Sequence, residues 1–201
     1  MTDNERMLIE QAMPGPDYIL TEEIVLPVTA DEAFDAVCAF DMTDVRDRAS
    51  RMALWLRALP ERLSRRVDNR QRTRFTVDDL VIGTDWILLG RRPGAEVALG
   101  AVGRFWTPVV RWKAVTPEEY AEFANPRWGK IAMSFIVLPY GERRSVVAYE
   151  VRIAFFDEAT RRMFDRYWWS VRPFVARVLR GMLHTIRDTA IDHTAAAARI
   201  A

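Results

Sequence analysis

The chain has 201 residues, of which 50% are hydrophobic and 28% are charged, a balance typical of one globular domain with a sizeable core. Its 29 basic and 28 acidic side chains give a formal net charge of +1, so no overall positive field favours nucleic acid or an anionic membrane surface as a partner. No segment reaches the roughly 18 uninterrupted apolar residues that a membrane helix needs, so we expect no membrane span.

The single cysteine and the amino-terminal stretch bear on the compartment. Cys38 lies among apolar neighbours and has no second cysteine with which to form an intramolecular disulfide. The stretch MTDNERMLIEQAMPGP has neither the basic start nor the long apolar run of a secretory signal. These features predict a cytoplasmic protein in which Cys38 packs in the interior rather than acting as a nucleophile.

The first predicted elements are a strand and a helix. After a polar leader that ends at PGP (14–16), residues 17–26 carry the alternating and β-branched side chains of a strand. Thr29 and Glu32 have the spacing of a capping box, which predicts that a helix begins there.

Two predictions concern the region that follows. Residues 50–66 are typical of a second helical segment, stopped or bent at Pro60. Arginines crowd residues 65–74, which we interpret as a solvated loop rather than a nucleic-acid site.

From Thr84 to Phe156 the pattern changes to strands, interrupted by one short helix that Thr116, Pro117 and Glu119 would start. The predicted strands cover residues 85–92, 95–106, 109–115, 130–139 and 145–156.

A long closing helix is predicted to begin after Asp157 and to run to about residue 192. Apolar side chains recur along it at three- and four-residue spacing and form one stripe: Phe164, Trp168, Val171, Val175, Leu179, Met182 and Ile186. A helix of this length with one apolar stripe must lie across a sheet, and Pro173 should bend it. The order of elements indicates an α+β fold in a single domain over 1–201, with its core over about 17–190.

Four stretches resemble the SRPBCC superfamily, the START-like helix-grip proteins that include polyketide cyclases and lipid-transfer proteins. LPVTADEAFDAV resembles the entry from the first strand into the first helix, and ALGAVGRFW resembles a G-x-x-G-x-x-W stretch of the sheet. AYEVRI and RRMFDRYWWSVRPFVARVLRGML are similar to the E-x-R-V strand and the F-x-x-Y-W-x-x-x-x-P closing helix of one bacterial branch. The resemblance implies a curved antiparallel sheet wrapped around the long C-terminal helix, with a ligand cavity between them.

The alternation of side chains along each strand predicts which residues face that cavity. Glu150 and Arg152 point away from it and are predicted to form an exposed ion pair on the outer face of the sheet, rather than a catalytic acid and an anion clamp. The predicted cavity walls are Trp86, Leu88, Phe105, Trp112, Met133, Phe135, Tyr149, Tyr167, Trp168 and Val171.

The common catalytic signatures are missing from the sequence. His184 and His193 have no cysteine or carboxylate cluster at ligand spacing, which argues against a metal site. The sequence contains neither G-x-S-x-G nor a phosphate loop ending in Gly-Lys-Ser/Thr, so we expect no cofactor and assign no catalytic residues.

Three functions stay open on this basis. The favoured function is the binding of a small hydrophobic molecule, such as a lipid, a polyketide or an aromatic metabolite, in the cavity. The second is a polyketide cyclase or dehydratase in the same cavity, with Tyr149 and Tyr167 as its polar participants. The third is a protein-interaction domain with a filled core, with Trp106, Trp128 and Trp169 as interface candidates; a homo-oligomer is an open alternative.

Overall fold

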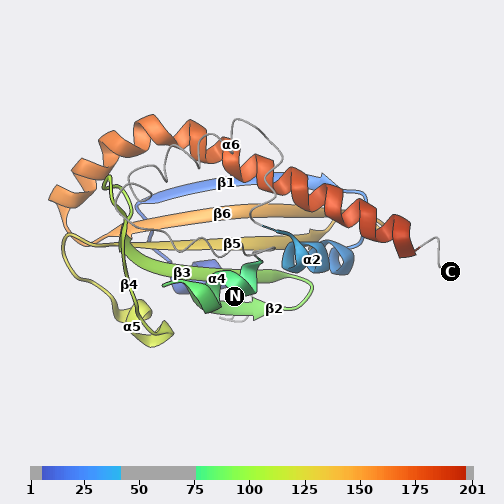
Figure 1. The fold of residues 1–201 in the computed structure, drawn as a ribbon, viewed down its shortest axis with the longest axis horizontal. Helices are drawn as coiled ribbons and strands as arrows, with labels where there is room; N and C mark the ends of the chain where they lie inside the picture. The colour runs from blue at the N-terminus through green and yellow to red at the C-terminus, as the bar shows by residue number, and fades with distance from the viewer. Residues whose placement is uncertain (1–5, 42–75, 198–201) are drawn as a thin grey trace, which may run out of the picture.

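The computed structural model describes residues 6–41 and 76–197 and shows an α+β fold in which a long helix crosses one face of a curved antiparallel sheet (Figure 1). The described strands are β1 (Tyr18–Leu26), β2 (Ile87–Arg92), β3 (Glu96–Arg104), β4 (Arg111–Lys113), β5 (Gly129–Pro139) and β6 (Ser145–Phe155). The described helices are α1 (Leu8–Ala12), α2 (Ala30–Ala39), α4 (Val77–Gly83), α5 (Pro117–Glu122) and α6 (Glu158–Ala197). The helical segment predicted over 50–66 and the basic loop predicted over 65–74 lie outside the described residues.

The strands are joined in the order β1-β6-β5-β3-β2, and the short strand β4 pairs with β3. All of these pairings are antiparallel. Strands β5 and β6 pair along their whole length, from Gly129 opposite Phe155 to Pro139 opposite Ser145. The predicted α+β class and the helix-grip arrangement, a curved sheet beneath one long C-terminal helix, are confirmed.

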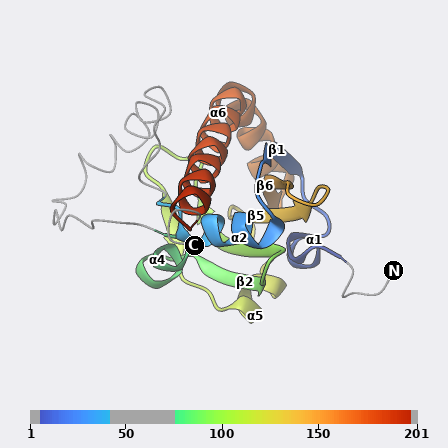
Figure 2. The ribbon, with the colours of Figure 1, turned by 90° about the vertical axis from the view of Figure 1, so that its right-hand side faces the viewer.

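The two faces of the sheet bury two separate apolar clusters. Side chains of β3, β5 and β6 such as Leu99, Phe135 and Val151 pack beneath α2 and α6. Their neighbours along the strands, such as Val102 and Ala132, face the opposite side and pack with residues of α1 and α5. Figure 2 shows α6 on one side of the sheet and α1 on the other. The predicted alternation therefore assigns the faces of β3, β5 and β6 as the structure does.

The predicted helix starts are present. Thr29 and Glu32 form a capping box at α2, and Thr116 and Glu119 form one at α5. The carboxylate of Asp157 accepts a hydrogen bond of 2.8 Å from the backbone N–H of Thr160 in the first turn of α6.

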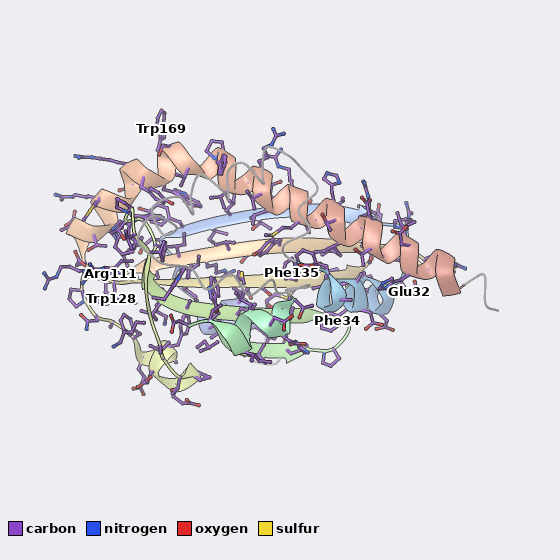
Figure 3. All side chains as sticks on the ribbon, viewed as in Figure 1. Glu32, Phe34, Arg111, Trp128, Phe135 and Trp169 are labelled. Atoms are coloured by element: carbon purple, nitrogen blue, oxygen red, sulfur yellow. The ribbon has the colours of Figure 1, made fainter. Side chains whose placement is uncertain are left out.

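Helix α6 has 40 residues and continues to Ala197, five residues beyond the predicted end. It changes direction along its length, and Trp169 stands on the outside of this bend (Figures 1 and 3). Pro173 explains the bend, because it has no N–H to donate to the carbonyl of Trp169, the residue four positions earlier.

The polar leader is the first departure from the sequence analysis, because it contains α1, which covers the outer face of the sheet. Ile9 and Met13 are buried there. The carboxylate of Glu96 on β3, itself only 1% exposed, accepts hydrogen bonds from the backbone N–H groups of Leu8 (2.6 Å) and Ile9 (3.1 Å). Its capping group comes from a distant strand, so the local sequence does not show the start of this helix.

The predicted exposure of Glu150 and Arg152 on β6 is wrong, because the N-terminal segment covers this face of the sheet. Glu150 and Arg152 do pair on the outer face, at 2.6 Å, but Arg152 is only 9% exposed. Its guanidinium also donates to the carbonyl oxygen of Met13 at 3.0 Å, just after α1. The pair therefore fastens the N-terminal segment to the sheet instead of facing solvent.

Candidate functional site

The ten predicted wall residues separate into three groups. Met133, Phe135 and Tyr149 lie deep beneath α2 and α6. A second group packs with the N-terminal part of α6: Phe105, Tyr167 and Trp168. Val171, also on α6, is half-buried but does not belong to the buried cluster. The third group, Trp86, Leu88 and Trp112, lines cavities that open at the β2 edge of the sheet.

The first group fills the interior. The rings of Phe135 and Tyr149 stack with centroids 4.2 Å apart, and Phe40, which follows α2, meets Phe135 edge to face. The hydroxyl of Tyr149 donates a hydrogen bond of 3.0 Å to the sulfur of Met133. Burial raises the pKa of Tyr149 above its ordinary value, so this phenol stays protonated at neutral pH. It has the character of a packed core side chain rather than of an acid or base ready to exchange a proton.

Phe164 of α6 lies at the centre of the second group, which we call the aromatic cluster. Its ring lies close to six others: Tyr18, Phe105, Trp106, Phe155, Tyr167 and Trp168. Trp106 is therefore buried and does not supply an exposed interface. Trp169, which points away from the cluster, is 84% exposed.

A third arrangement offers a site, which we call the tryptophan pocket. It has a volume of about 690 Å³ and lies between the end of α4 and strand β4. Its lining residues are Gly83, Thr84, Asp85, Trp86, Val109, Val110, Arg111, Trp112 and Trp128. Figure 3 shows Arg111 and Trp128 together at the end of the sheet that lies away from Phe34 of α2. Three indole rings and two side chains of opposite charge therefore border one cavity.

Local sequence fixes Trp86 and Trp112, which pack against each other in the wall of this pocket. Thr84 ends α4, and its hydroxyl donates to the carbonyl of Leu80 and accepts from the backbone N–H of Trp86. Trp112 lies over Gly103, where an added Cβ would come within 2.5 Å of the indole, so only glycine allows this approach. The rings of Trp86 and Trp112 are 5.6 Å apart.

The pocket is continuous with the packed interior on one side. Phe105 of the aromatic cluster stacks on Trp112 with centroids 6.0 Å apart. Trp86 and Trp112 are only partly buried, so each lines the cavity while it packs against the core. A ligand placed here would contact rigid aromatic walls that the fold already holds in place.

Several pocket residues are not among the predicted cavity walls. Asp85 and Arg111 were not assigned to the cavity, and Trp128 was considered only for an interface. The guanidinium of Arg104 covers the Trp128 ring at 4.8 Å. Alternation along the strand places Arg111 on the face opposite to Trp112, so it could not have assigned Arg111 to this pocket. Trp128 lies on an irregular connection before β5, where no periodicity applies.

The described ranges 6–41 and 76–197 lack the features of two other classes of site. No group of three histidine, cysteine or acidic residues there has the arrangement of a metal site. None of the helices in those ranges combines the length and the apolar composition needed to cross a bilayer.

No protein-family model matches the chain, and no curated protein matches it. Among solved structures, the chain is similar to Mll3558 from Rhizobium loti, with 15% identity over 84% of this chain and 96% of that one and a TM-score of 0.38. Norcoclaurine synthase from Thalictrum flavum has 9% identity over 96% and 97% of the two chains and a TM-score of 0.42. TTHA0849 from Thermus thermophilus has 10% identity over 88% and 99% and a TM-score of 0.30.

Proposed function

We propose that the protein binds a small hydrophobic molecule with an aromatic ring in the tryptophan pocket. One observation carries this proposal: Trp86 and Trp112 pack against each other, with ring centroids 5.6 Å apart, and both line a cavity of about 690 Å³. Ligand pockets typically have volumes of roughly 300–1,000 Å³, with apolar walls and a few polar groups.

The indole rings would supply the apolar part of the binding free energy, and polar groups form the larger share of the exposed pocket wall. A ligand that removes about 200 Å² of apolar surface from water gains roughly 5 kcal/mol at about 25 cal/mol per Å². Because the rings are already held by Gly103 and Phe105, little side-chain order has to be created on binding. A gain of about 5 kcal/mol corresponds to a Kd of roughly 0.2 mM before the cost of association is subtracted, so tighter binding needs polar contacts as well.

Arg111 favours one class of ligand. Its guanidinium can donate to a carboxylate, sulfonate or phosphate on the ligand while the ring contacts the tryptophans. We therefore expect an aromatic molecule with an anionic substituent to bind more tightly than its neutral counterpart.

The cyclase alternative stays a prediction. Tyr149 lies in the packed core and Tyr167 lies beside Phe164, and neither lines this pocket.

The test is a fluorescence titration with 1-anilinonaphthalene-8-sulfonate, which combines aromatic rings with one sulfonate. We expect the wild-type protein to bind one equivalent, and Trp112→Ala to weaken binding at least tenfold. Arg111→Gln should weaken this probe several-fold and leave the neutral N-phenyl-1-naphthylamine unaffected.

Trp169→Ala is the matched control, because it removes the same ring from an exposed position on α6. Equal affinity in wild type and a folded Trp112→Ala variant would reject the tryptophan pocket. Native mass spectrometry of the gently purified protein, followed by extraction, would then identify any bound molecule and its chemical class.

A further inference from the structure

The chain contains 27 arginines but only two lysines, Lys113 and Lys130. Lys113 is exposed on β4, as is usual for a lysine. Lys130 lies on the outer face of β5 and is only 7% exposed. A protein that uses arginine for almost every positive charge has therefore placed one of its two lysines in its interior.

Lys130 borders a second cavity, which we call the outer cavity. It has a volume of about 600 Å³ and lies between α1, α5 and the outer face of the sheet, opposite the face that carries α6. Its walls are mostly apolar and include Leu8, Met13, Leu89, Tyr120 and Phe156. The volume is that of a small-molecule pocket.

The ammonium group of Lys130 has few partners. Its Nζ donates one hydrogen bond of 3.3 Å to the carbonyl of Ala121 and lies 4.3 Å from the centroid of the Tyr120 ring. No carboxylate of the described residues forms an ion pair with it. The hydroxyl of Tyr120 is already committed, because it donates to the carbonyl of Ile131.

We propose that the outer cavity binds a hydrophobic monocarboxylic acid, with the Lys130 ammonium group as the counter-ion of its carboxylate. An ammonium group has three N–H donors, and the described contacts of Lys130 use one for a hydrogen bond. A buried charge without an opposite charge is costly, and a bound carboxylate would supply that charge while its hydrocarbon part contacts the apolar walls. Burial also lowers the pKa of Lys130, which agrees with an ammonium group that lacks a counter-ion.

Isothermal titration with decanoate tests this site. We expect decanoate to bind the wild-type protein, Lys130→Met to weaken it at least tenfold, and the matched control Lys113→Met to bind as the wild type does. Decanol, which lacks the charge, should bind wild type and Lys130→Met equally. Wild-type affinity in Lys130→Met would overturn the proposal.

The Trp112→Ala variant separates the two sites. Decanoate binding should be unchanged in it, because the tryptophan pocket is on a different part of the sheet. Loss of decanoate binding in Trp112→Ala would place the carboxylate in the tryptophan pocket and reject the outer site. The naphthalene-sulfonate titration is independent, so failure of one proposal leaves the other standing.

A second measurement needs no variant. With only two lysines, a sample labelled with ¹⁵N in its lysine side chains gives one Nζ signal for each. Decanoate should raise the pKa read from the Lys130 signal by at least about one unit, as a nearby carboxylate does, and leave Lys113 unchanged. An unmoved Lys130 signal at saturating decanoate would also overturn the proposal.

Discussion

Lys130 shows how a single residue can make stability depend on pH. Its ammonium group is shielded from water and lies near the Tyr120 ring and the carbonyl of Ala121. Burial therefore lowers the pKa of Lys130 below the ordinary lysine value. The unfolded chain keeps its lysine protonated up to about pH 10.4. Between the lowered pKa and that value the unfolded state binds more protons than the folded state, so stability rises with pH in this window.

We therefore predict that the wild-type protein gains stability relative to Lys130→Met as the pH rises from 7 towards 10. Removing the charge relieves a desolvation cost that is present at pH 7 and fades once the folded lysine loses its proton. The measurement is urea unfolding of both proteins at several pH values in this range. Lys113→Met should follow the wild type, and parallel curves for wild type and Lys130→Met would contradict the prediction.

At the scale of elements, α6 is held on the sheet by the aromatic cluster around Phe164. This ring is buried, and its neighbours come from β1, from the end of β3 and from β6 as well as from α6 itself. Edge-to-face contacts such as that between Phe164 and Phe105 add to the gain from burial.

Phe164→Ala should therefore reduce the free energy of unfolding by about 3–5 kcal/mol, the usual cost of a large cavity in a core. Phe174→Ala on the same helix is the control, because Phe174 is 39% exposed and should cost far less. Urea unfolding of the two variants measures the difference. Similar losses in both would show that α6 is not held mainly through Phe164.

The elements also show what the sequence could and could not predict. The starts of α2 and α5 were predictable because Thr29 and Thr116 each form a capping box with the glutamate three residues further along the chain. Helix α1 was not, because the carboxylate that caps it belongs to Glu96, 88 positions after Leu8. Alternation assigned Phe135 and Trp112 to the face beneath α6, but it could not show that Phe40 and Tyr149 fill the space around Phe135. Which inward residues border a cavity depends on long-range packing.

For the whole molecule, the sheet separates two cores. The cluster beneath α6 contains Phe164, and the cluster beneath α1 and α5 contains Ile9 and Tyr120. Glu96 joins α1 to the sheet on the outer side, and its carboxylate also accepts a hydrogen bond of 2.9 Å from the hydroxyl of Ser134. The two proposed ligand sites lie in different parts of this layered arrangement.

This arrangement predicts that substitutions on the two faces of the sheet change the free energy of unfolding independently. Glu96→Gln replaces a buried acceptor of three hydrogen bonds and should cost about 1–3 kcal/mol, and Phe164→Leu should cost about 1–1.5 kcal/mol. Residues without shared partners have additive effects, so the double variant should lose the sum of the two within about 0.5 kcal/mol. Urea unfolding of the wild type, the two single variants and the double variant measures the coupling energy between the two sites. A coupling energy above about 1 kcal/mol would show that the sheet transmits strain between its faces, and occupation of the outer cavity would then be expected to alter the tryptophan pocket.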